Sequence, residues 1–495
     1  MLDKIDLNYT VGRKEYRQEM NALETRLISL QQQIREYKIP VLIVFEGWSA
    51  SGKGTLIGKL LNPLDPRYFN VYTLDRATQD AVMRPFLWRY FSNLPSVGRI
   101  AIYDKSWHRI AQPEGEKKWR LTEKEIDGFY YDVNAFEEQL ASDGILVIKL
   151  FLHISKEEQR RRFKEILKNP DTKWRVDEDD LKQNEDYHSC LKRFESMILE
   201  SNTGLSKWSV VEANDKNYAT LKIYKVIISK IEEEIARRIA ANEPAAILRQ
   251  NPITAPAVSI LSSIDLDKKI SKEEYKEKLA HYQNKMSDLG FKLYTKRRSV
   301  VMVYEGWDAA GKGGNIKRMT QELDPRGYEV VPSAAPTQDE LNHHYLWRFW
   351  NKMPKDGHFA IFDRSWYGRV MVERIEGFCT TEEWQRAYKE INDMEKHMVN
   401  HGTVIFKFWI HIDKEEQLKR FQLRQTDPLK QYKITDEDWR NREKWDQYEK
   451  AVDEMLFRTN TDYAHWKVIE SNDKKYARIK TLEYVVKELE KQLGD

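Results

Sequence analysis

Cysteine is scarce in this sequence of 495 residues, because only Cys190 and Cys379 are present. Two cysteines cannot build a disulfide framework or a cysteine-rich zinc site, so we interpret both as ordinary reduced thiols. Glycine (21) and proline (15) are also few, which favours long helices over frequent turns. No hydrophobic run approaches the roughly 18 residues of a membrane-spanning helix, and the N-terminal MLDKIDLNYT lacks the apolar segment of a secretory signal. We therefore expect a cytoplasmic protein without membrane contacts.

Net charge is almost absent as well. Lys and Arg together number 82, and Asp and Glu number 79, a difference of +3. This balance excludes a globally basic nucleic-acid-binding protein, although a local basic groove stays compatible with a nearly neutral chain. Charged residues make up 33% and hydrophobic residues 41% of the sequence, which is typical of a folded globular protein. Length alone suggests about three domains.

An internal repeat changes that domain count. Corresponding segments, 259 residues apart early in the repeat and 258 later, are FEGWSASGKG (45–54) and YEGWDAAGKG (304–313), AIYDKSW (101–107) and AIFDRSW (360–366), and KLFLHISKEEQ (149–159) and KFWIHIDKEEQ (407–417). A unit this long is a whole domain copied once, not a solenoid repeat. We therefore predict two domains, 1–237 and 261–495, joined by a linker at 238–260.

Both copies have the same predicted order of elements. A charged helical region (12–37 and 271–296) leads into short apolar runs that are typical of buried strands. The predicted strands are 41–45, 98–104 and 145–154 in the first copy, and 300–304, 358–363 and 403–412 in the second. Short apolar strands that alternate with charged helices predict an α/β fold with a parallel sheet. Ligands of such sheets bind beyond the carboxyl ends of the strands.

The turn after the first strand of the second copy fits the phosphate-binding pattern G-x-x-x-x-G-K, with Gly306, Gly311 and Lys312. Glycines let backbone N–H groups surround phosphate oxygens, the next helix adds its N-terminal dipole, and the lysine adds a point charge. Gly313 stands where the usual loop has a serine or threonine that binds Mg²⁺. A metal ligand must therefore come from elsewhere, and Asp308 inside the loop is the natural candidate.

A second acidic motif ends the next buried strand of the same copy. HFAIFDRSWYGR places Asp363 at the strand end, where a Walker B-like carboxylate reaches Mg²⁺ directly or through water. An aspartate that merely caps the following helix is the alternative. Arg364 follows at once and Arg369 lies five residues further on. Together with the phosphate loop, the motif favours a metal-linked carboxylate.

These motifs resemble a known family. GWDAAGKGG, LDPRG and FDRSWYGRVMVERIEG are similar to motifs of the polyphosphate kinase 2 family over nearly the full length of both copies, and the tandem arrangement resembles its two-domain branch. The resemblance implies two tandem P-loop kinase-like domains, each a parallel sheet flanked by helices with a helical lid. It also implies Mg²⁺-dependent, reversible transfer of a terminal phosphoryl group from inorganic polyphosphate to AMP, giving ADP. The expected partners are polyphosphate and AMP or ADP, without nucleic acid, and a homo-oligomer is compatible with the sequence.

The resemblance also assigns roles to residues of the second copy. Asp308 and Asp363 would be the metal-linked carboxylates, and Lys312 and Arg364 would complete the catalytic set. Phosphate contacts are expected from Gly306, Gly311, Gly313 and Arg369 and, in a lid spanning 414–446, from Arg420, Arg424, Lys433, Arg442 and Lys444. The nucleotide or acceptor side is expected at Glu340, Arg348 and Glu373. A string of Lys and Arg suits a polyanion that carries no bases to read, although each lid cation taken alone also fits a solvated helix face.

The first copy departs from the pattern. Ser49 replaces the loop carboxylate, and Asn184 and Asp186 replace two lid cations. Because Mg²⁺ is held mainly by anionic oxygens, the loss of one carboxylate should weaken its binding. We predict that 1–237 is catalytically degenerate, with a structural or polyphosphate-binding role, and that 261–495 catalyses.

The second acidic motif of the first copy is altered as well. It reads YDKSWHRIAQ, so that His108 stands for both Tyr367 and Gly368 if Arg109 aligns with Arg369. The strand-end acid and the cation after it are retained. Phosphate binding therefore remains compatible with this copy.

Two other functions fit parts of the sequence. The first is an ATP-dependent nucleoside or nucleotide kinase on the same P-loop core, which the missing serine or threonine after Lys312 disfavours. The second is a non-enzymatic polyphosphate-binding protein, for which damage to the metal motifs of both copies is expected. The motifs of the second copy are intact, which favours an enzyme.

Overall fold

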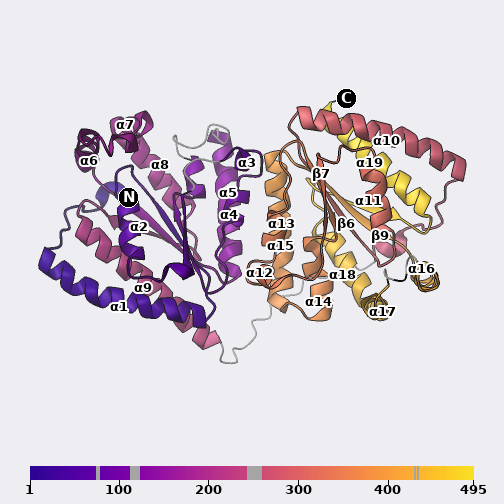
Figure 1. The fold of residues 1–495 in the computed structure, drawn as a ribbon, viewed down its shortest axis with the longest axis horizontal. Helices are drawn as coiled ribbons and strands as arrows, with labels where there is room; N and C mark the ends of the chain where they lie inside the picture. The colour runs from indigo at the N-terminus through magenta and orange to yellow at the C-terminus, as the bar shows by residue number, and fades with distance from the viewer. Residues whose placement is uncertain (74–77, 112–122, 242–258, 429–430, 432–433, 495) are drawn as a thin grey trace. The chain divides into compact units, whose positions relative to one another are not determined.

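The computed structural model describes residues 1–73, 78–111, 123–241, 259–428, 431 and 434–494, and is drawn in Figure 1. The chain forms two compact units. Unit 1 consists of Met1–Val82, Arg89–Arg249 and Gln338–His344, and unit 2 of Met83–Trp88, Gln250–Thr337 and Tyr345–Asp495. Met83–Trp88 comes from the first copy but is part of unit 2, and Gln338–His344 comes from the second copy but is part of unit 1. In the described ranges, every helix is too short or too polar to cross a bilayer.

A parallel sheet forms the centre of unit 1. Its strands are β1 (Val41–Gly47), β2 (Phe69–Thr73), β3 (Ile100–Asp104), β4 (Leu146–His153) and β5 (Trp208–Glu212), in the order β2-β3-β1-β4-β5. Helices cover both faces of the sheet (Figure 1). They are α1 (Arg13–Glu36), α2 (Lys53–Leu61), α3 (Gln79–Val82), α4 (Trp88–Phe91), α5 (Glu123–Ser142), α6 (Lys156–Lys168), α7 (Glu178–Glu185), α8 (Tyr187–Glu200) and α9 (Lys216–Ala241).

Unit 2 repeats this arrangement. Its strands are β6 (Val300–Gly306), β7 (Tyr328–Pro332), β8 (Phe359–Asp363), β9 (Val404–His411) and β10 (Trp466–Glu470), in the order β10-β9-β6-β8-β7. The helices are α10 (Lys272–Thr295), α11 (Lys312–Thr320), α12 (Gln338–Leu341), α13 (Trp347–Trp350), α14 (Val372–Glu376), α15 (Thr381–His401), α16 (Lys414–Thr426), α17 (Asp436–Glu443), α18 (Trp445–Arg458) and α19 (Lys474–Leu493). Of these, α12 belongs to unit 1 and the rest to unit 2.

The strands that the sequence predicts are the inner strands of each sheet. β1 and β6 are central and almost completely buried, as their continuous β-branched runs require. β8 and β7 lie on one side of β6, and β9 and β10 lie on the other. The connections that leave the two sides of β6 therefore run in opposite directions across the sheet. This switch point at the carboxyl end of the central strand is where ligands of such sheets bind, and the phosphate loop begins there.

The edge strands β2, β5, β7 and β10 are not apparent from the sequence. Their residues are mostly half-buried or exposed, and they lack the continuous apolar run of the inner strands. The predicted leading helices are confirmed as α1 and α10. The predicted lid region contains α16 and α17, followed by the start of α18. The predicted linker begins inside α9, which continues to Ala241, and residues 242–258 lie outside the described ranges.

Candidate active site

The phosphate loop of unit 2 connects β6 to α11, and close packing fixes its backbone. Gly306 has φ +147°, and a Cβ there would lie 2.4 Å from the carbonyl oxygen of Ile410 on β9. Ala309 and Gly311 also adopt the left-handed region, with φ of 62° and 113°. Such backbone is strained for alanine and easy for glycine. The close approach of Gly306 to β9 and the positive φ angles of Ala309 and Gly311 therefore define the curl of the loop.

Lys312 opens α11 and folds back over the loop. Its ammonium donates to the carbonyl oxygen of Gly306 at 2.7 Å and lies 3.4 Å from that of Trp307. Gly313 is exposed, and a Cβ at this position would meet no atom within 4 Å. Lys312 is thus held beside the loop. The space around residue 313 does not require a glycine, although other phosphate loops have a serine or threonine there.

Asp308 lies between two elements that are far apart in the sequence. Its Oδ1 accepts a hydrogen bond from Arg364 Nη2 at 3.0 Å, and its Oδ2 accepts one from Asn441 Nδ2 at 3.0 Å. Burial raises the pKa of Asp308, but the positive charges of Lys312 and Arg364 outweigh this effect and hold the pKa below its ordinary value. This carboxylate is therefore ionised near neutral pH and is linked to α17 of the lid.

Asp363 is the last residue of β8 and is half-buried. The parallel register pairs it with Tyr304 of β6, four residues before the loop carboxylate of Asp308. Arg364, which follows, has φ +66°, a conformation that turns the chain sharply and lets its side chain reach Asp308. The two predicted metal-linked carboxylates therefore stand at the carboxyl ends of adjacent strands.

Glu305, which the sequence reading missed, fixes that turn. It is buried on β6, and one of its oxygens accepts from the backbone N–H of Ser365 at 2.7 Å and from the Ser365 hydroxyl at 2.8 Å. Burial raises the pKa of Glu305 to about 7, against the hydrogen bonds from Ser365 and the attraction of Lys312. The sequence did contain a signal for this role, because a glutamate stands directly before the first loop glycine in both copies. In unit 1, Glu46 accepts the same two hydrogen bonds from Ser106.

The acidic side chains set limits on a metal site. Among the described residues, no group of three or more His, Cys, Asp or Glu side chains is arranged to hold a metal ion. Asp308 and Asp363 are a pair of carboxylates, and Mg²⁺ needs no more, because it takes its other ligands from water and from substrate phosphates. Its place in this site stays a prediction.

Arg420 corrects one expectation about phosphate contacts. Its Nε donates to Glu416 at 2.7 Å, while its other nitrogens donate to backbone carbonyl oxygens. Those acceptors are Ala309 (3.0 Å), Ala310 (2.8 Å), Ser471 (2.5 Å) and Asn472 (3.1 Å). A guanidinium has five N–H donors, and all five are occupied here. Arg420 therefore braces the phosphate loop against the β10–α19 turn and has no donor left for substrate.

The remaining predicted lid cations have different surroundings. Arg442 Nη1 donates to the carbonyl oxygen of Lys414 at 2.5 Å. Lys444 forms an ion pair with Glu376 of α14, with both oxygens at 2.9 Å from the ammonium. Arg424 is half-buried in the last turn of α16, and Lys433 lies outside the described residues. Their phosphate-binding roles stay predictions.

Arg369, Glu373 and Arg348 form a second charged group in unit 2. Arg369 Nε lies 3.2 Å from Glu373 Oε2, and its guanidinium carbon lies 4.4 Å from the ring centroid of Tyr345. Burial raises the pKa of Glu373, while the charges of Arg369 and Arg348 oppose this. The structure therefore brings together three residues that were predicted for phosphate binding and for the acceptor side.

Glu340 was predicted for the acceptor side together with Arg348 and Glu373. It lies on α12, in the segment Gln338–His344, which belongs to unit 1. Arg348 and Glu373 belong to unit 2. A role for Glu340 on the acceptor side stays a prediction.

A buried charge network supports the second acidic motif. Glu395 of α15 and Lys407 of β9 form a fully buried ion pair at 2.8 Å. Glu395 also accepts from Trp366 Nε1 at 3.1 Å and from the Tyr367 hydroxyl at 2.6 Å. The side chains that follow Asp363 are therefore anchored in the interior.

The same network in unit 1 corrects the alignment of the motif. Glu137 pairs with Lys149 at 2.6 Å and accepts from Trp107 Nε1 at 2.9 Å. His108 Nε2 lies 2.8 Å from Glu137 Oε1, where the Tyr367 hydroxyl stands in unit 2. His108 thus replaces Tyr367 alone, so that Arg109 falls at the position of Gly368 and not of Arg369.

The loop of unit 1 keeps its shape without the carboxylate. The backbone N–H of Ser49 donates to Gln183 Oε1 at 2.9 Å. Gln183 corresponds in sequence to Asn441, which in unit 2 donates to the Asp308 carboxylate instead. Lys53 donates to the carbonyl oxygen of Gly47 at 2.9 Å, as Lys312 does to Gly306. Burial lowers the pKa of Lys53 to about 8, and the nearby Lys105 and Arg109 add to this shift.

Fold and site together define a P-loop kinase-like protein, because a glycine-rich loop joins a central parallel strand to a helix and a carboxylate ends the neighbouring strand. Comparisons with known proteins are more specific. The family model "Polyphosphate kinase 2" matches residues 10–238 and 269–494. The chain therefore belongs to the polyphosphate kinase 2 family, and both copies are members of it.

Individual relatives match over nearly the whole length. The chain is 38% identical over 493 residues to a protein of Pseudomonas aeruginosa named polyphosphate:AMP phosphotransferase, covering 97% of each chain. It is 36% identical over 495 residues to a protein of the same name from Pseudomonas syringae pv. tomato, covering 99% of this chain and 98% of the relative. A crystal structure of a polyphosphate kinase 2 protein from Pseudomonas aeruginosa superposes with a TM-score of 0.86 at 34% identity and covers 99% of both chains. The tandem fold is thus shared with a solved member of the family.

Proposed function

We propose that the protein transfers the terminal phosphoryl group of inorganic polyphosphate to AMP, giving ADP and a polyphosphate shorter by one unit. An oxygen of the AMP phosphate attacks the terminal phosphorus, the bridging P–O bond breaks, and the shortened chain leaves with the bonding electrons. Two full-length relatives named polyphosphate:AMP phosphotransferase support this reaction. The observation that carries it for this chain is the position of Asp308 between Arg364 and the lid residue Asn441, beside Lys312.

Positioning and charge neutralisation are the main tasks of a protein in phosphoryl transfer. Lys312 stands beside the loop, where the N–H groups at the start of α11 would receive phosphate oxygens. Arg364 is exposed apart from its bond to Asp308 and can exchange that carboxylate for a phosphate oxygen. Arg is suited to this exchange, because its planar donors match phosphate in two-point contacts.

Mg²⁺ is the metal that this donor set fits. Asp308 and Asp363 would hold it together with water and phosphate oxygens, and it would supply positive charge to the transferring group. Hydrogen bonds from Arg364 and Asn441 hold the Asp308 carboxylate in place at this site.

The second copy carries the reaction in this proposal. Its loop carboxylate has no counterpart in unit 1, where Ser49 offers only a hydroxyl at that position. A hydroxyl has no net charge to attract the ion. The first copy keeps the loop and the lysine, which suit phosphate binding more than transfer.

Product analysis tests the proposal. The full chain is incubated with polyphosphate plus AMP, ADP or GMP in turn, with and without Mg²⁺, and nucleotides are separated by chromatography. We expect ADP from AMP only when Mg²⁺ is present, and faster than any product from ADP or GMP. Product formed from ATP plus AMP but not from polyphosphate plus AMP would instead identify an ATP-dependent kinase. Polyphosphate binding without any product would identify a non-enzymatic binding protein.

A further inference from the structure

Glu376, the last residue of α14, is an acid that the proposed function leaves without a role. Its side chain is 10% exposed, and each of its oxygens lies 2.9 Å from the ammonium of Lys444, which directly follows α17. Arg440 Nε of α17 lies 3.8 Å from Glu376 Oε2. Because the carboxylate and these cations compensate one another where little water reaches them, Glu376 ties the lid helix α17 to α14.

Tyr448 of α18 extends this contact from Glu376 toward the phosphate loop. Its hydroxyl lies 3.4 Å from Glu376 Oε1 and 3.3 Å from Asn441 Oδ1, and its one hydrogen serves either acceptor. Asn441 Nδ2 in turn donates to Asp308 Oδ2 at 3.0 Å. A series of four side chains therefore runs from α14 through α18 and α17 to the loop carboxylate.

The Tyr448 hydroxyl favours one orientation of the Asn441 amide. An amide has an accepting oxygen and a donating nitrogen, whereas an ionised carboxylate only accepts. With Oδ1 turned to the hydroxyl, Nδ2 faces the carboxylate of Asp308. Burial and the negative charges of Glu376 and Asp308 raise the pKa of Tyr448, so its hydroxyl keeps the proton that it donates.

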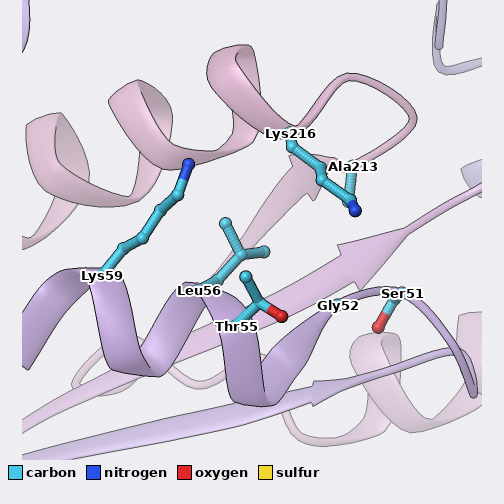
Figure 2. A pocket seen from close by; sticks show the side chains of 7 residues that line it. All are labelled: Ser51, Gly52, Thr55, Leu56, Lys59, Ala213 and Lys216. Atoms are coloured by element: carbon cyan, nitrogen blue, oxygen red, sulfur yellow. The ribbon is translucent and has the colours of Figure 1, made fainter. Parts of the chain in front are cut away.

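Unit 1 has the phosphate loop but different residues in this series. Its loop turns through Ser51 and Gly52 into α2, and Gly52 is left-handed as Gly311 is in unit 2 (Figure 2). Three positions differ in sequence, with Gln183, Cys190 and Asp186 in place of Asn441, Tyr448 and Lys444. The series of unit 2 thus occurs in the copy whose loop has a carboxylate to hold.

We propose that Glu376 and Tyr448 are positioning residues for phosphoryl transfer, which set α17 so that Asn441 orients the Asp308 carboxylate. Both act through Asn441 and touch no reacting atom. The inference rests on the proposed function for the reaction, and on the contacts within unit 2 for the lid. Because α14 also carries Glu373, one short helix supports both the predicted acceptor side and the loop carboxylate.

Steady-state kinetics with polyphosphate and AMP test these roles. Tyr448→Phe should lower kcat by about 3- to 10-fold, the effect of one hydrogen bond, and leave KM for AMP unchanged. Glu376→Gln should lower kcat by at least about threefold in the same way. In an Asn441→Ala background, Tyr448→Phe should change kcat by less than about twofold, because its target is gone. An equal loss in both backgrounds would overturn the proposal, as would an unchanged kcat in both single variants.

Two control variants match this chemistry. Glu454→Gln removes a carboxylate that is 11% exposed and also joins α18 to α14, through Arg374 at 2.7 Å. Tyr463→Phe removes a hydroxyl that donates to the carbonyl oxygen of Asn392 at 3.0 Å. Both should keep kcat within about twofold of the wild type. A loss in Glu454→Gln equal to that in Glu376→Gln would show that Glu376 only docks α14, and would overturn the proposal.

Amide hydrogen exchange without substrate separates this inference from the proposed function. The α17 amides should exchange about 3- to 10-fold faster in Glu376→Gln and Tyr448→Phe than in the wild type and the controls, while those of β6 stay unchanged. Unchanged α17 exchange, or faster exchange throughout unit 2, would overturn the proposal. If Glu376→Gln does not fold, as judged by circular dichroism, Tyr448→Phe carries the test. A wild type that does not phosphorylate AMP would refute the proposed function, while exchange still decides whether these residues set the lid.

Discussion

The two phosphate loops share a backbone and differ in what their side chains hold. Gly47, Ala50 and Lys105 of unit 1 have φ of 131°, 57° and 70°, and their counterparts in unit 2 have 147°, 62° and 66°. The loop conformation has thus survived the replacement of aspartate by Ser49, because packing against β4 and the Arg162 brace maintain it. The comparison teaches that the phosphate cradle and the metal-linked carboxylate are separable parts of this fold.

The largest expected difference between the copies concerns the carboxylate. Asp308→Asn should lower kcat by roughly 100-fold or more, because charge stabilisation in the transition state is lost. Ser49→Asn is the matched control and should change kcat by less than about twofold. Steady-state kinetics with polyphosphate and AMP measure both. Activity near normal in Asp308→Asn would refute the assignment of catalysis to unit 2.

A reciprocal change sharpens the same point. Ser49→Asp restores a carboxylate to unit 1, where the lid counterpart is Gln183 and not asparagine. In the Asp308→Asn background we expect no recovery of activity, because unit 1 also lacks the lid cations of unit 2 and has Asn184 and Asp186 at those positions. Recovery would mean that one side chain alone separates the two copies.

The loop lysines should differ almost as much. Lys312→Ala should lower kcat/KM by about 100-fold, because the point charge beside the transferring group is removed. Lys53→Ala should leave kcat unchanged within about twofold. Comparison of the two variants at saturating AMP gives the answer. Equal losses would show that both copies catalyse.

The loop braces should separate stability from activity. Arg420→Ala and Arg162→Ala each leave buried carbonyl groups without donors, so each should destabilise its own unit by roughly 2–4 kcal/mol. Urea unfolding monitored by circular dichroism measures this loss. Activity should fall by about tenfold in Arg420→Ala only. A larger loss of activity in Arg162→Ala would place catalysis in unit 1.

The smallest expected effect depends on pH. Burial raises the pKa of Glu305 from 4.5 to about 7, so the folded state retains a proton that the unfolded chain releases at lower pH. The wild type should therefore lose stability as pH rises from about 5 to about 7, by on the order of 1–3 kcal/mol. Glu305→Gln cannot ionise and should lack this slope while it keeps an oxygen for Ser365. Thermal unfolding of both proteins between pH 5 and 8 tests this, and parallel profiles would contradict it.

The sequence was sufficient for the parts of the site that are contiguous. The loop from Gly306 to Lys312 and the strand-end Asp363 lie on short segments whose pattern dictates their local backbone. The duplication was equally visible, because it depends only on matching residues. The edge strands were missed because a half-exposed strand has no continuous apolar run to mark it.

Long-range contacts escaped the sequence reading for a physical reason. Arg420 is a lid cation by position, yet its donors are used by residues about 110 and about 50 positions away along the chain. Glu395 and Glu305 carry no motif that distinguishes them from surface glutamates. Only burial and the geometry of their partners reveal their structural roles.

By itself, then, the sequence determined that the protein is a duplicated α/β phosphate-binding fold with one copy altered at the metal-linked position. The tertiary structure decided how Asp308 is held and that the donors of Arg420 are used by the phosphate loop and the β10–α19 turn. The difference has one cause. Local patterns fix backbone conformation over a few residues, whereas the state of a charged side chain depends on partners that only folding brings within about 3 Å.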